Sequence, residues 1–144
     1  MSKTPEVPST PLLDPATWSG CIFDGGWRPG AAGDAAVVEP ATGDELGRTG
    51  LAGADDVARS ACRAAEAQRE WAAAPFEERA AILRRAGDLW ERQAADVEWW
   101  LIREAGSIPP KAAVETHAAA QECYEAAALS SHALGEILPT VQPG

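Results

Sequence analysis

Residues 37–92 read VVEPATGDELGRTGLAGADDVARSACRAAEAQREWAAAPFEERAAILRRAGDLWER, and this stretch decides the fold. Its first part holds two short apolar runs around Pro40-Ala41-Thr42-Gly43-Asp44. Because Pro, Gly and Asp supply the backbone angles of a reversing turn, these residues predict a β-hairpin over 37–48. The second part predicts two helices separated by Ala74-Pro75. Pro75 suits a first helical position, where its missing N–H is not needed.

Apolar residues recurring at three- and four-residue spacing predict helices at about 55–71, 75–93, 94–105 and 110–134. Gly106 and Gly135 suit the ends of the last two helices. The predicted buried faces are Val57, Ala61, Ala64, Ala65, Gln68 and Trp71 for the first helix; Ile82, Leu83, Ala86, Leu89 and Trp90 for the second; Val97, Trp100 and Leu101 for the third; and Ala113, His117, Ala120, Tyr124, Ala127, Ser131 and Leu134 for the last. One of the adjacent Trp99 and Trp100 is expected to face a surface that this chain does not supply.

Two further segments precede residue 37. Asp24-Gly25-Gly26 between two apolar ends predicts a tight hairpin over 21–28, and no phosphate-binding glycine pattern surrounds it. Residues 1–17 carry four prolines, at 5, 8, 11 and 15, and predict a flexible arm. The predicted fold is therefore mostly α, with about four helices preceded by two small β-hairpins.

The composition excludes several classes of function. A net charge of −10 and a pI near 4.6 argue against a nucleic-acid or anionic-membrane partner, because phosphate binding draws on clustered Lys and Arg. Cys21, Cys62 and Cys123 are too widely spaced for a zinc site or a disulfide framework, so no metal is expected. No signal peptide or membrane-spanning run is apparent, and a cytoplasmic protein is expected.

Several motifs follow one another along the chain: Glu39-Pro40-Ala41-Thr42-Gly43-Asp44, Asp55-Asp56-Val57, Trp71, Pro75-Phe76-Glu77-Glu78-Arg79-Ala80 and Leu83-Arg84-Arg85. In this order they resemble the N-terminal region of the NAD(P)-dependent aldehyde dehydrogenase superfamily. Residues 103–112 and Gly135-Glu136-Ile137-Leu138-Pro139 are similar to the benzaldehyde and vanillin dehydrogenase branch. The resemblance runs from about Trp18 to Gly144. It implies that 18–144 is the N-terminal part of a cofactor-binding domain, that this domain is incomplete here, and that the parent enzyme is α/β with a Rossmann-like cofactor domain.

The resemblance also implies a chemistry: oxidation of an aldehyde to the carboxylic acid with NAD or NADP, in a homodimer or homotetramer. The family's segments for the thiol nucleophile, the general base, the oxyanion donor and the nucleotide loop are absent from this sequence. We therefore assign no catalytic or cofactor-binding residue, and we expect this chain alone to bind no cofactor and to be inactive. By the resemblance, Val114 and Ala118 lie on the side of the aldehyde tunnel, and the small Ala118 leaves room for an aromatic ring.

Two interpretations of function remain open at this point. The first is a segment of an aromatic-aldehyde dehydrogenase, whose partners are the aldehyde and the remainder of the polypeptide. The second is a stand-alone helical module that binds a partner protein through its Trp and Ala faces and has no enzymatic activity. Under the first interpretation the isolated chain offers a helix layer with no sheet to cover, so we expect partial order or self-association when it is produced alone.

Overall fold

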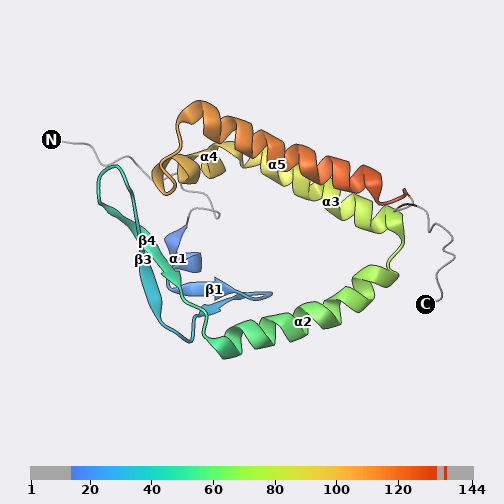
Figure 1. Ribbon diagram of the computed structural model, residues 1–144, viewed down its shortest axis with the longest axis horizontal. Coiled ribbons are helices and arrows are strands. Elements are labelled where there is room, and N and C mark those ends of the chain that lie inside the picture. The colour runs from blue at the N-terminus through green and yellow to red at the C-terminus, as the bar shows by residue number, and fades with distance from the viewer. Residues whose placement is uncertain (1–13, 133–134, 136–144) are drawn as a thin grey trace, which may run out of the picture.

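The computed structural model describes residues 14–132 and 135, and it shows a mostly helical chain with two small antiparallel hairpins, as predicted. The elements follow in the order α1 (Pro15–Trp18), β1 (Cys21–Phe23), β2 (Trp27–Pro29), β3 (Asp34–Val38), β4 (Glu45–Gly50), α2 (Ala54–Ala73), α3 (Phe76–Arg92), α4 (Ala94–Arg103) and α5 (Pro109–Leu129). Figure 1 shows the hairpins at the left end of the view, α3 and α5 along the top with α4 at their hairpin end, and α2 along the bottom.

Helix α1 begins within residues 1–17, the segment predicted to be a flexible arm. Asp14 begins the turn: its side-chain Oδ1 accepts a hydrogen bond from the Ala16 amide at 2.9 Å, and its carbonyl accepts one from the Thr17 amide at 3.0 Å. An aspartate in this position supplies an acceptor to the free amides of a helix start. The remainder of the predicted arm, residues 1–13, lies outside the described residues.

Each hairpin is a separate two-stranded sheet. Strands β1 and β2 pair from Cys21 opposite Pro29 to Phe23 opposite Trp27, and Gly25 in their turn has a φ of 71°. Strands β3 and β4 pair from Asp34 opposite Gly50, with an irregularity after Val37. The second hairpin therefore begins three residues before the predicted bound, because the apolar pattern used to predict it starts only at Val37.

The helix bounds differ from the predicted ones by a few residues. Pro75 is the N-cap of α3, not its first helical residue, and Ala74 before it is extended, as expected for a residue that precedes proline. Helix α5 ends at Leu129, five residues before the predicted end at Leu134, which lies outside the described residues. Gly106, the predicted cap of α4, has a φ of 69° and lies three residues after the last helical residue, Arg103, while Glu104 is the C-cap.

Small residues make the contact between α3 and α5, which lie side by side (Figure 1). A Cβ atom at Gly87 would lie 2.6 Å from Cε1 of Tyr124, so the tyrosine ring occupies the space that any side chain would need. The Tyr124 hydroxyl donates a hydrogen bond to Asp88 Oδ1 at 3.0 Å. The buried residues of the two helices are Ala80, Gly87, Ala112, Thr116, Ala120 and Ala127.

The predicted faces of these helices need correction. In α5 the buried residues are Ala112, Thr116, Ala120 and Ala127. Ala120 and Ala127 belong to the predicted face, whereas the predicted Ala113 and His117 are exposed. The error arises because alanines on both sides of the helix leave almost no periodic contrast in hydrophobicity. In α3 the large side chains of Ile82, Leu89 and Trp90 are exposed, and smaller residues pack on α5.

Helix α2 runs apart from α3 and α5 except at the connection before Pro75 (Figure 1). Its predicted apolar face is not covered by the described part of the chain: Val57 is 61% exposed, and residues 61–73 are all exposed. Its N-terminal end is the anchored one, because Asp56 is its one buried residue.

Candidate functional site

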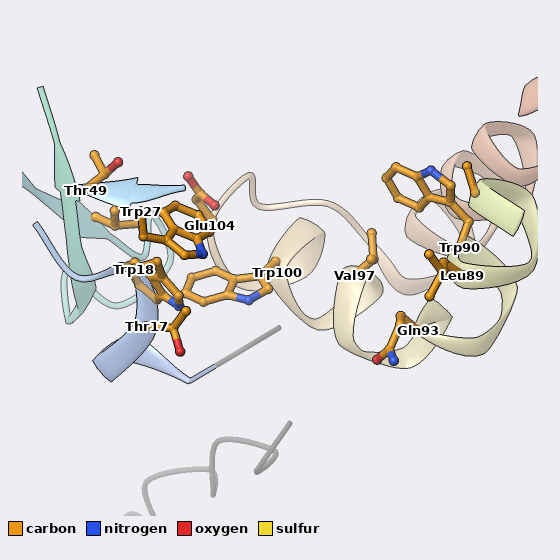
Figure 2. A pocket seen from close by; sticks show the side chains of 12 residues that line it. Thr17, Trp18, Trp27, Thr49, Leu89, Trp90, Gln93, Val97, Trp100 and Glu104 are labelled. Atoms are coloured by element: carbon orange, nitrogen blue, oxygen red, sulfur yellow. The ribbon is translucent and has the colours of Figure 1, made fainter. Parts of the chain in front are cut away.

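An open apolar groove of about 860 Å³ lies between the hairpins and helices α3 and α4. Figure 2 shows Trp18, Trp27 and Trp100 toward the hairpin end, and Leu89 and Trp90 toward α3. The full lining is Thr17, Trp18, Trp27, Val37, Thr49, Ala86, Leu89, Trp90, Gln93, Val97, Trp100 and Glu104. Leu89 and Trp90, the large side chains of α3 that remain exposed, therefore line this groove.

Trp18 and Trp100 stand edge to face in this groove, with ring centroids 5.5 Å apart and planes at 77°. Trp18 also lies against β4, where a Cβ at Gly47 would come within 2.5 Å of Trp18 Cη2. Trp99 packs edge to face on Trp100 at 4.9 Å, and the Arg103 guanidinium lies 5.3 Å from the Trp99 ring centre. Of the two adjacent tryptophans, Trp100 is thus the one that faces the groove.

Sequence reasoning did not assign Trp18 or Trp27 to any site. The signal available was composition, since 6 tryptophans in 144 residues are many for a chain with so few other aromatic residues. Composition alone does not say that segments so far apart meet in one groove.

The groove does not fit a nicotinamide dinucleotide. Its polar lining residues are Thr17, Thr49, Gln93 and Glu104, and no Lys or Arg lines it. A pyrophosphate needs convergent N–H donors or a helix N-terminus, and the carboxylate of Glu104 would repel it. An apolar surface with a few polar groups at its rim suits another protein surface instead.

Asp56 is the centre of a buried polar cluster that anchors α2 to the hairpins. Asp56 is 2% exposed, and its carboxylate accepts hydrogen bonds from the Ala31 amide at 2.8 Å and the Gly53 amide at 2.9 Å. Arg28 pairs with it at 3.1 Å, and Arg59 also binds it. The two amides, aided by the arginines and opposed by burial, hold the pKa of Asp56 below its usual 3.8.

Asp24 forms the second half of this cluster. Arg28 pairs with it at 2.6 Å and Arg63 at 3.3 Å. Burial by itself raises the pKa of Asp24, but the hydrogen bonds from the two arginines outweigh it, and the pKa is lowered. An open hollow of about 480 Å³ lies beside the cluster and includes Cys62 and Glu66 in its lining.

The residues considered for chemistry stand apart from one another. Cys21, Cys62 and Cys123 are free thiols, and no group of three or more His, Cys, Asp or Glu residues could hold a metal within the described part of the chain. Val114 is 68% exposed and Ala118 is exposed, on the side of α5 away from the buried Thr116. No helix in the described ranges is both long and apolar enough to cross a membrane.

A comparison with family models decides the family, because the aldehyde dehydrogenase family model matches residues 27–144. The chain belongs to the aldehyde dehydrogenase family. This aldehyde dehydrogenase chain is 64% identical over 132 residues to a vanillin dehydrogenase of Amycolatopsis sp., covering 92% of the chain and 27% of that protein. It is 40% identical over 127 residues to a benzaldehyde dehydrogenase [NAD(+)] of Pseudomonas putida, covering 88% of the chain and 26% of that protein.

Solved structures agree with this assignment. An NAD-dependent benzaldehyde dehydrogenase from Corynebacterium glutamicum matches with a TM-score of 0.74 and 34% identity, over 90% of this chain and 28% of that one. An aldehyde dehydrogenase from Brucella melitensis matches with a TM-score of 0.80 and 28% identity, and the match covers 94% of this chain and 28% of that one. The resemblance to this family is thus confirmed, and the aldehyde dehydrogenase chain spans about a quarter of the length of the relatives it matches.

Proposed function

We propose that this chain is the N-terminal part of an enzyme that oxidises an aromatic aldehyde, such as vanillin or benzaldehyde, to the carboxylic acid with NAD or NADP. The 64% identity to a vanillin dehydrogenase and the 40% identity to a benzaldehyde dehydrogenase support the substrate class. We place the enzyme in the cytoplasm, as a homodimer or homotetramer.

The observation that carries the proposal is the uncovered apolar groove. Trp18, Trp27, Leu89, Trp90 and Trp100 present aromatic and aliphatic surface to it. A large apolar surface of this kind on one body normally belongs to an interface. In the proposed enzyme, residues 18–144 form the N-terminal part of the cofactor-binding domain, and the remainder of the polypeptide packs into this groove and along α2.

The proposal gives this chain a supporting and positioning role. The groove of this chain does not fit a dinucleotide. NAD or NADP, when held by the remainder of the enzyme, would accept the hydride of the aldehyde. In this proposal the chain on its own is inactive, and its contribution to the site is the outward face of α5, where Val114 and Ala118 border the aldehyde.

A hybrid enzyme tests the proposal. In it, this chain replaces the matching 132 residues of the Amycolatopsis vanillin dehydrogenase. The hybrid should reduce NAD or NADP with vanillin or benzaldehyde, while the isolated chain should not. A folded hybrid without aldehyde oxidation, or an isolated chain that oxidises benzaldehyde unaided, would overturn the proposal. A hybrid that prefers small aliphatic aldehydes would overturn the aromatic substrate class.

A further inference from the structure

Tyr124 lies against the backbone of α3 at Gly87 and holds α5 at a fixed distance from it. The three nearest ring atoms stand 2.6, 2.8 and 3.0 Å from the place of a Gly87 Cβ, whereas ordinary contacts of a Cβ begin at about 3.4 Å. The hydroxyl of the same ring is bound to Asp88, the next residue of α3. Moving the ring aside for a side chain at residue 87 would disturb that hydrogen bond.

Val114 and Ala118 lie on the opposite side of α5 and are exposed. Thr116, on the buried side, is 3% exposed, and its hydroxyl has no hydrogen-bond partner among the described residues. A helix moves as a stiff rod over a few turns, and residues 114 and 118 lie only about 9 to 15 Å along the axis from Tyr124. A change in the spacing between α3 and α5 therefore displaces the outward face as well.

From this geometry, and resting on the proposed function, we infer that Gly87 and Tyr124 are positioning residues that set the distance between α5 and the aldehyde, and so the width available to an aromatic ring. Gly87 lets α5 sit close to α3, and Tyr124 stops it from coming closer. Neither residue touches the substrate. Their effect passes through Val114 and Ala118, so it should depend on the size of the aldehyde.

The test is substrate discrimination in the hybrid enzyme. Gly87→Ala pushes α5 outward, and the ratio of kcat/KM for vanillin to kcat/KM for acetaldehyde should fall about tenfold, mainly through KM, because a pocket that changes by about one methylene discriminates to that extent. Gly87→Ala combined with Tyr124→Leu makes room for the new methyl and should restore most of the ratio. Tyr124→Leu alone lets α5 settle inward and should raise the ratio.

The outcomes separate this inference from the proposed function. If the unaltered hybrid does not oxidise vanillin, the proposed function fails. If it does, and Gly87→Ala changes both substrates alike with no recovery in the double variant, only the positioning role fails. Should Gly87→Ala not fold, Tyr124→Leu decides the matter, since an unchanged substrate ratio in that variant also overturns the inference.

Discussion

Arg103 in α4 holds its Nε 2.6 Å from Oε1 of Glu39, which follows β3 and is only 6% exposed. The other carboxylate oxygen of Glu39 accepts a hydrogen bond from the Thr42 hydroxyl at 2.8 Å. Residues 64 positions apart are thus joined by a partly buried ion pair, which ties the second hairpin to the helical layer beside the groove. This pair therefore connects the second hairpin to α4 across a long stretch of sequence.

Removing one partner of the pair should destabilise the protein. Arg103→Met leaves the Glu39 carboxylate buried without its cation, which should cost the hybrid enzyme about 2 to 4 kcal/mol of unfolding free energy in urea. The control is Lys111→Met, which breaks the exposed pair with Glu115 at 2.5 Å and should cost less than about 1 kcal/mol. Equal effects would show that the Glu39–Arg103 pair has no special structural role.

The lowered pKa of Asp56 predicts an acid-dependent loss of stability. In the unfolded chain this carboxyl titrates near its usual 3.8, and in the folded chain it titrates lower. Its contribution is therefore fully present above about pH 5 and is lost as the pH falls below 4 and through the folded pKa. Melting temperatures of the hybrid measured from neutral to acidic pH should fall more steeply than those of Asp56→Asn. Asp55→Asn, in the same helical turn but exposed, should keep the slope of the unaltered hybrid.

Tyr124 is the single tyrosine of the chain, so its ionisation can be followed by absorbance without interference from other tyrosines. Burial, followed by the hydrogen bond to Asp88, raises its pKa from 10.0 to about 12. Because the folded state favours the neutral phenol, this contribution is complete below pH 10 and is lost as the pH rises toward 12. A titration midpoint near 10 in the isolated chain would mean that α3 and α5 are not packed there.

The exposed apolar groove predicts that the isolated chain self-associates. Leu89 is 52% exposed in this chain and lines the groove. Leu89→Asp should reduce self-association of the isolated chain in sedimentation experiments and destabilise the hybrid by about 3 kcal/mol, because it would bury a charge at the proposed contact. The matched control is Leu129→Asp, at an exposed leucine outside the groove lining, which should change both measurements little. A sharp cooperative melt from a monomeric isolated chain would contradict the expected self-association.

The outward face of α5 predicts substrate selection. Ala118→Trp in the hybrid should raise KM for benzaldehyde about tenfold more than KM for acetaldehyde, because the indole fills space that a flat ring needs. Ala126→Trp, at an exposed alanine further along the same helix, should leave the ratio of the two KM values unchanged. If Ala118→Trp raised KM equally for both aldehydes, Ala118 would not border the aldehyde.

Local signals in the sequence predicted the elements well. Gly25, Gly43 and Gly106 all adopt the positive φ that their turns require, and Pro75 separates α2 from α3. The helix faces were predicted less well, since Ala113 and His117 were assigned to the buried side of α5 in place of Ala112 and Thr116. A face rich in alanine carries little hydrophobic contrast, so periodicity cannot orient it.

The sequence by itself determined the hairpins, the helices and the family, because turn residues, helix periodicity and ordered motifs are properties of neighbouring residues. Only the tertiary structure decided that Trp18, Trp27, Leu89 and Trp100 share one groove and that Asp56 gathers Arg28 and Arg59. These associations join residues distant along the chain. They depend on how closely backbones approach, as at Gly47 and Gly87, and no local pattern encodes that distance.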